Sequence, residues 1–156
     1  DRSPPTAARG GPQAKGALML MRIDHIGIAV EDLDASVEHY RRTLGIEPVH
    51  RERVESQGVE EVLLAVGDSY VQLLGALGPD TPVGRFLARQ GQGVHHVGYR
   101  VEDLARALAH LKAEGVRLID EAPRLGSRGT SIAFVHPKGM GGVLVELVQD
   151  GAGSPA

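Results

Sequence analysis

An internal repeat with an offset of 71 residues is the feature that most constrains how this chain can fold. Residues 23–33 (IDHIGIAVEDL) align with residues 94–104 (VHHVGYRVEDL), and the same His, Gly, Val, Glu, Asp and Leu residues occupy matching positions. Apolar and other residues alternate before the Glu-Asp-Leu segment, which is typical of a strand, and an amphipathic pattern follows it. Each copy therefore predicts a strand that leads into a helix.

The two helices are predicted at Leu33 to Leu44 and Leu104 to Glu114, and Gly45 and Gly115 are expected to end them. A third helix, at roughly Pro82 to Gln90, connects the two copies. Strand-like runs follow the repeated helices at Val59–Val66, Tyr70–Leu74, Ile132–Val135 and Gly142–Val148.

We interpret residues 21–149 as one domain with an α+β fold, in which two modules share a sheet. The modules cover about residues 21–80 and 92–149. Two copies of this length are too few for a solenoid, which needs about three repeats or more, so a pseudo-twofold pair is the simpler architecture.

Both ends of the chain have the composition of unstructured segments. Residues 1–20 combine Pro, Gly and Arg without apolar periodicity, so we predict a disordered extension or a cloning remnant, with the natural start at Met19 or Met21. Residues 150–156 are predicted to be a disordered tail.

Composition excludes several classes of function. A net charge of -3 and an aromatic content of 3% argue against nucleic acid as a partner. No run of eighteen apolar residues is present, so no membrane span is predicted, and the absence of a secretory signal favours the cytoplasm. The absence of cysteine excludes disulfides and thiolate ligands, so a bound metal would need imidazole, carboxylate or amide oxygen.

Four polar residues stand in otherwise apolar strands. His25 and His96 occupy equivalent positions of the repeat, and pseudo-symmetry would bring them to a common centre; the alternative is two hydrogen-bonded core histidines. Gln72 and Glu146 each lie inside an apolar run. A buried carboxylate needs a cation, a proton or an exposed edge, and the last of these is the alternative for Glu146. Together the four residues offer an N2O2 ligand set with room for exchangeable positions, as in catalytic sites.

The segments that carry these residues resemble methylmalonyl-CoA epimerases, which belong to the vicinal-oxygen-chelate (glyoxalase and bleomycin-resistance) superfamily. The likeness runs from about Arg22 to Gln149 and includes the motifs DHIGIAV, HHVGYRV, FVHPK and GVLVEL. It implies two tandem βαβββ modules that form a curved mixed sheet around a metal site, and a homodimer. It also implies a divalent ion (Co, Mn, Ni or Zn) bound by His25, Gln72, His96 and Glu146. Whether the modules pair within one chain or across the dimer stays open.

The resemblance further implies an activity on an acyl-CoA substrate. Methylmalonyl-CoA would be epimerised at C2 through a metal-stabilised enolate, with Glu61 and Glu146 as the two acids that exchange protons with opposite faces. Glu61 matches the family pattern by its distance from Gly58, whereas a one-residue register error would select Glu60 instead.

The residues that hold the CoA phosphates are less specific. Ser127, Arg128 and Gly129 form a glycine-flanked turn whose amides could reach an anion, and Lys138 is a further candidate. Ordinary solvated surface charges are the alternative for each.

Three other functions fit parts of the pattern. A glyoxalase-type isomerase or lyase would use a similar metal set on a glutathione conjugate. An extradiol dioxygenase fits less well, because Gln72 would occupy a position that its iron needs open. A non-enzymatic small-molecule binding protein of the same fold has no need for all four ligands.

Overall fold

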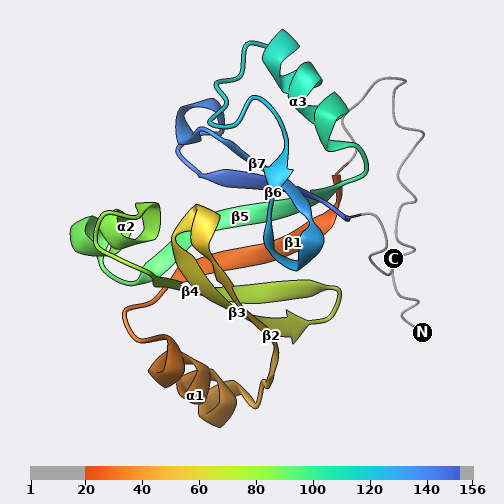
Figure 1. Ribbon diagram of the computed structural model, residues 1–156. Coiled ribbons are helices and arrows are strands. Elements are labelled where there is room, and N and C mark those ends of the chain that lie inside the picture. Colours follow the sequence, from red (N-terminus) through yellow and green to blue (C-terminus); the bar gives the residue numbers. More distant parts are fainter. Residues whose placement is uncertain (1–19, 152–156) are drawn as a thin grey trace, which may run out of the picture.

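The computed structural model describes residues 20–151 and contains the same unit twice (Figure 1). The first unit consists of β1 (Leu20–Ala29), α1 (Leu33–Leu44), β2 (Pro48–Val54), β3 (Val59–Val66) and β4 (Ser69–Ala76). The second consists of β5 (Gly93–Val101), α3 (Leu104–Ala113), β6 (Arg124–Leu125), β7 (Ser131–Val135) and β8 (Val145–Gln149). The helix α2 (Pro82–Gln90) connects them, and short 3-10 turns lie at Glu55–Gln57, Ser127–Gly129 and Pro137–Gly139. The predicted tandem βαβββ order is confirmed.

The Glu-Asp-Leu segments begin the repeated helices by the same capping contact. Asp32 accepts a hydrogen bond from the backbone N–H of Ala35, and Asp103 accepts one from Arg106, each at 3.0 Å. Such a cap satisfies one of the free N–H groups of the first turn. The first helix ends at Gly45 with φ 67°, as predicted, because glycine adopts this left-handed conformation without steric cost.

One curved sheet of eight strands unites the two modules, in the order β2-β3-β4-β1-β5-β8-β7-β6. Within the modules β1 pairs with β4, and β5 with β8, both in parallel. The modules meet where β1 and β5 pair in antiparallel fashion along the middle of the sheet. The two modules therefore pair within the chain.

Two helices cover the convex face of the sheet and leave the concave face for polar side chains. The segments around α1 bury Val30, Val37, Val62, Leu64 and Leu73. Against α3, the second half buries Val101, Leu104, Ala107, Leu108, Ala133, Val135, Val145 and Leu147. Because neighbouring residues of a strand face opposite sides, the residues between these apolar ones point into the curve.

The connecting helix α2 closes one end of the concave face. Its Val83 packs with Val59 of β3 and Leu74 of β4 in a third apolar cluster. Thr81 caps α2 by accepting a hydrogen bond from the Gly84 N–H, and Pro82 occupies the first turn, where its missing N–H costs nothing. The concave face is therefore bounded by α2 at one end.

The structure differs from the predicted elements at several boundaries. The last strand begins at Val145 rather than Gly142, because Gly141 and Gly142 have positive φ angles of 66° and 94° that end any extended pairing. Glu114 caps α3 instead of belonging to it. The sequence patterns named no strand at Pro48–Val54, which the structure assigns to β2.

The predictions for residues 1–19 and 152–156 concern segments outside the described residues. Strand β1 begins at Leu20, one residue before the predicted start of the domain. Asp150, predicted to begin the tail, accepts a hydrogen bond from Arg100 Nη1. Within residues 20–151, no helix is long and apolar enough to cross a membrane.

Candidate metal centre and active site

The two repeated histidines lie on the central strand pair, each opposite a glycine. In the β1–β5 register, His25 is opposite Gly98 and Gly27 is opposite His96. A Cβ atom at either glycine would lie only 2.5 Å from Nδ1 of the opposing imidazole, a separation that side chains do not tolerate. The His-x-Gly pattern of each copy thus makes room for the ring of the other copy.

His25, His96 and Glu146 converge on one point of the concave face, and each is 3–5% exposed. The two Nε2 atoms are 2.8 Å apart, and Glu146 Oε2 lies 3.2 Å from His25 Nε2 and 3.0 Å from His96 Nε2. With bonds of 2.0–2.1 Å, neighbouring ligand atoms are separated by roughly 2.9 Å in an octahedral site and roughly 3.3 Å in a tetrahedral one. The triangle of donor atoms therefore fits a divalent cation, and fits six-coordination better.

Gln72, the fourth predicted ligand, lies on β4 and is 7% exposed. Its Nε2 donates a hydrogen bond to Glu61 Oε2, whereas its Oε1 is buried with no hydrogen-bond partner in the described part of the chain. A buried amide oxygen without a partner is costly, and a cation is a suitable partner for it. The donor set thus fits a metal ion on the evidence of its own unsatisfied atom.

The charges of the cluster favour a bound cation. Burial alone would raise the pKa of Glu146, but the charge of His25 and the hydrogen bonds from both histidines hold that pKa well below its ordinary value. Burial alone would lower the pKa of His25, but the charge of Glu146 and the hydrogen bond to Asp24 raise it to about 9. The negative charge that stabilises a proton on His25 would also stabilise a metal ion bound there.

A buried ion pair between Asp24 and Arg100 lies on the Nδ1 side of the His25 ring. His25 Nδ1 lies 2.7 Å from Asp24 Oδ2, and Arg100 Nε donates to Asp24 Oδ1 at 3.0 Å. Burial opposes ionisation of Asp24, yet its contacts with His25 and Arg100 lower the pKa of the carboxyl group overall. Carboxylates in this position orient metal-binding histidines. The sequence patterns did not identify Asp24 as part of the site; its position directly before His25 was the available signal.

Glu61 faces the site and Glu60 does not. Glu61 is 1% exposed, its Oε2 accepts from Gln72, and its Oε1 has no hydrogen-bond partner among residues 20–151. Glu60 instead pairs with Arg51 at the surface, where Arg51 Nε donates to it at 2.7 Å. Opposite faces of β3 therefore separate these two adjacent carboxylates.

Strand β2 adds two residues that the sequence patterns missed. His50, Glu52 and Glu61 form a second group whose donor atoms all lie within 4.8 Å of one another. His50 Nε2 lies 3.3 Å from Glu52 Oε2, and Glu52 is directly opposite Glu61 in the β2–β3 register. Finding them required the strand itself, which had no clear alternating pattern.

The predicted CoA-binding residues occupy two separate turns. In the Ser127–Gly129 turn, Arg128 has a left-handed backbone with φ 56°, and its N–H donates to Glu52 Oε2 at 3.1 Å. The Arg128 guanidinium lies 5.0 Å from the Tyr70 ring centre. Lys138 is exposed in the Pro137–Gly139 turn.

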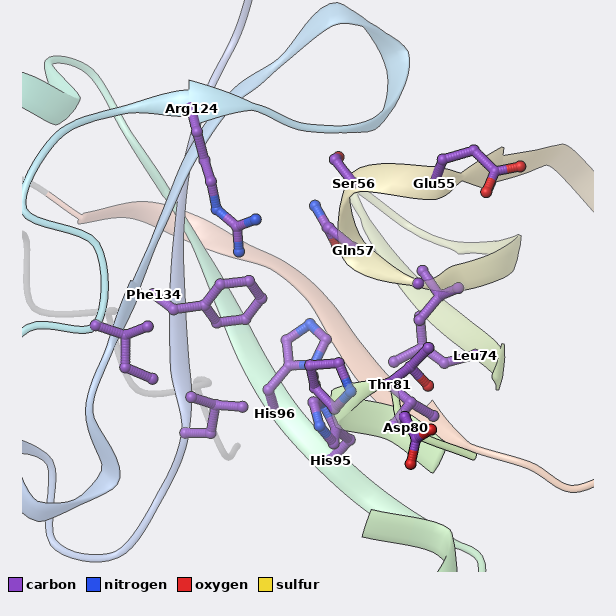
Figure 2. Close-up of a pocket in the computed structure, with 16 residues that line it drawn as sticks. Glu55, Ser56, Gln57, Leu74, Asp80, Thr81, His95, His96, Arg124 and Phe134 are labelled. Carbon is purple, nitrogen blue, oxygen red and sulfur yellow. Dashed lines mark hydrogen bonds between the residues drawn. The ribbon is translucent and has the colours of Figure 1, made fainter. Parts of the chain in front are cut away.

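A cavity of about 400 Å³ adjoins the cluster (Figure 2). His95 and His96 lie side by side at its base, Phe134 forms one wall, and Arg124 points inward over the Phe134 ring. A neighbouring cavity of about 520 Å³ also contacts both histidines and extends past Arg85 and Arg89 of α2, among other residues. Burial and the neighbouring His96 lower the pKa of His95 to about 4, so its ring is neutral at pH 7.

Comparison with known proteins shows the family to which the chain is related. Residues 24–134 match the model of the glyoxalase/bleomycin resistance protein/dioxygenase superfamily. The chain is 37% identical over 133 residues to an ethylmalonyl-CoA/methylmalonyl-CoA epimerase of Cereibacter sphaeroides, covering 84% of this chain and 99% of the relative.

Two solved structures are similar over most of their length. One is a variant of Streptomyces coelicolor methylmalonyl-CoA epimerase in complex with 2-nitronate-propionyl-CoA, with 46% identity and a TM-score of 0.82 over 86% of this chain and 100% of that one. The other is a methylmalonyl-CoA epimerase in complex with methylmalonyl-CoA and NH4+, with 47% identity and a TM-score of 0.82 over 88% and 100% of the two chains.

Proposed function

Because the chain belongs to the methylmalonyl-CoA epimerase family of the glyoxalase/bleomycin resistance protein/dioxygenase superfamily, we propose that it interconverts the 2R and 2S epimers of methylmalonyl-CoA. One structural observation supports the proposal in addition to the family relationship. Besides the buried cluster of His25, His96 and Glu146, two buried side-chain oxygens have no hydrogen-bond partner among residues 20–151: Gln72 Oε1 and Glu61 Oε1. The Gln72 oxygen can give a lone pair to a cation, and the Glu61 oxygen can accept a proton.

Epimerisation at C2 breaks one C–H bond and forms another on the opposite face. The C2 proton is acidic because it lies between a thioester and a carboxylate, and its bonding electrons move into the thioester to form an enolate. One fixed side chain cannot readily serve both faces, so two acid–base groups are needed. Glu61 on β3 and Glu146 on β8 have β4, β1 and β5 between them in the curved sheet, with the histidine pair on the two inner strands.

Glu61 takes the proton from one epimer at Oε1, which has no hydrogen-bond partner in the described part of the chain. The contacts of Glu146 with the histidines use Oε2, which leaves Oε1 for the other face. Glu146 must carry a proton before it delivers one, although its contacts with the histidines favour the ionised form. The two glutamates exchange roles when the reaction runs in reverse. A divalent cation held by His25, Gln72, His96 and Glu146 would supply the positive charge that stabilises the enolate oxygen. Co, Mn and Ni suit the separations of the donor atoms better than tetrahedral Zn.

Cationic side chains outside the cluster are proposed to hold the CoA phosphates. The Ser127–Gly129 turn and Lys138 are one group of candidates. Arg85 and Arg89 are the other, since they lie one helical turn apart on α2 and border the cavity that also contacts His95 and His96. The continuity of that cavity with the cluster supports the α2 arginines.

A homodimer is also proposed for this chain. Leu20, Met21 and Ile23 of β1 are 46%, 58% and 46% exposed, although large apolar side chains are usually buried. Light scattering should give a mass close to twice 16.5 kDa; a mass of 16.5 kDa would contradict the dimer.

The experiment that tests the activity follows the C2 proton. Purified protein is incubated with (2R)-methylmalonyl-CoA in D2O, and NMR records loss of the C2 proton together with appearance of the 2S epimer, against an enzyme-free control. Exchange and epimerisation well above that control are expected. Turnover of the methylglyoxal–glutathione adduct, without exchange of methylmalonyl-CoA, would instead identify a glyoxalase-type isomerase and overturn the proposal.

A further inference from the structure

His95 occupies the same position relative to His96 that Asp24 occupies relative to His25. The two residues are related by the same offset of 71 that relates the histidines of the cluster. Asp24 Oδ2 lies 2.7 Å from His25 Nδ1, and His95 Nδ1 lies 2.9 Å from His96 Nδ1. Each central imidazole therefore has a hydrogen-bond partner at Nδ1 that the preceding residue of its own strand provides.

The hydrogen-bond chemistry of imidazole then determines where the protons lie. His96 Nε2 faces His25 Nε2 and Glu146 Oε2 in the cluster. If His96 Nε2 gives its lone pair to a cation, the proton of the neutral ring is on Nδ1. That Nδ1–H donates to His95 Nδ1, which must accept, so the proton of the neutral His95 ring is on Nε2.

We infer that His95 is a positioning residue that holds the His96 ring with Nε2 toward the metal centre. In the tautomer that this role requires, His95 also offers its Nε2–H as a hydrogen-bond donor to the substrate cavity. The inference rests on the metal site of the proposed function. The His95 ring borders both cavities beside the cluster, and Figure 2 shows it next to His96. Phe86 of α2 also contacts the His95 ring edge to face, with the ring centres 5.1 Å apart.

The pseudo-symmetry also gives a reason for a neutral partner in the second module. Asp24 is fully buried and is neutralised by Arg100 from the opposite strand. The repeat position that corresponds to Arg100 is residue 29, which is a fully buried alanine. A carboxylate at position 95 would have no such counter-ion, and a buried unpaired charge is costly. A neutral imidazole provides the acceptor without that cost.

Metal affinity in matched variants tests the inference. His95→Ala removes the acceptor, whereas His95→Asn restores a neutral oxygen at the branch length by which Asp24 reaches His25. Mn²⁺ or Co²⁺ affinity is measured by calorimetry after circular dichroism has established native secondary structure. Loss of a hydrogen-bond partner behind a ligand weakens binding about 10–100-fold, which is expected for His95→Ala, while His95→Asn should stay within roughly threefold of wild type. His39→Ala, which removes an exposed imidazole of α1, is the control and should not change the affinity.

Nitrogen-15 NMR of the Zn²⁺-loaded protein gives a second readout that does not depend on any variant. The proton of His95 is expected on Nε2. A proton on Nδ1, wild-type affinity in His95→Ala, or equal loss in His95→Asn and His95→Ala would each overturn the inference while leaving the epimerase proposal intact. Wild-type protein that binds no divalent ion would overturn the metal site, and with it the role of His95.

Discussion

The imidazole of His96 lies opposite Gly27, across the β1–β5 pair, in the space that a side chain at position 27 would need. His25 has the same relation to Gly98. Because the strands are antiparallel, each histidine is opposite the glycine that follows the other histidine by two residues. The two imidazole rings therefore have room to approach each other only because positions 27 and 98 are glycines.

Gly27→Ala is expected to displace the His96 ring and reduce divalent-metal affinity by at least tenfold, since metal sites lose affinity of this order when a ligand is misoriented. Calorimetric titration with Mn²⁺ measures the effect. Gly93→Ala in β5 is the control, because a Cβ there meets no heavy atom within 4 Å. Equal affinities in the two variants would show that the ring does not need the space over Gly27.

Glu61→Gln should reduce epimerisation by about 10²–10⁴-fold, which is the usual contribution of a general acid or base, while metal content stays at the wild-type level. The amide keeps the size of the side chain but cannot accept the C2 proton. Glu60→Gln is the matched control: this adjacent residue faces Arg51 at the surface, so near-normal turnover is expected. If Glu60→Gln were the inactive variant, the assignment of the base would be wrong.

Removal of metal by a chelator should abolish epimerisation and lower the melting temperature. An ion present at a hundredfold excess over its dissociation constant stabilises the native state by about 2.7 kcal/mol, or roughly 5–15 °C for a domain of this size. Gln72→Leu should reduce this shift, because it removes one ligand oxygen. The control Gln90→Leu changes an exposed residue at the end of α2 and should keep the full shift. A melting temperature that Mn²⁺ and Co²⁺ leave unchanged would contradict the metal site.

Arg85→Gln combined with Arg89→Gln should raise KM for methylmalonyl-CoA several-fold and leave KM for methylmalonyl-pantetheine unchanged, because pantetheine lacks the CoA phosphates. Arg128→Gln combined with Lys138→Gln serves as the comparison in steady-state kinetics with both substrates. A CoA-specific increase of KM in the second pair alone would place the phosphates at the turns instead of at α2.

The elements that the sequence patterns predicted correctly are those whose signals are local. Asp32 and Asp103 cap their helices through contacts three residues away, and Gly45 ends α1 through its own backbone conformation. Strand β2 was missed because its alternating residues are only partly buried and include charged side chains on both faces. Without β2, the residues His50 and Glu52 beside Glu61 had no place in the predicted site.

The repeat predicted that His25 and His96 would lie together, because strand alternation and a constant offset are properties of the chain itself. The apolar runs around Gln72 and Glu146 selected those two residues, whereas Glu61 was expected only from the family resemblance. All five residues are buried in the structure.

Only the tertiary structure decided which atoms meet. The curvature of the sheet, the pairing of β1 with β5 inside one chain, and the register that sets each histidine opposite a glycine come from side chains far apart in sequence. The contacts of Asp24 with Arg100 and of α2 with the cavity are of the same kind. Such contacts depend on the packing of the whole domain, and no local pattern records them.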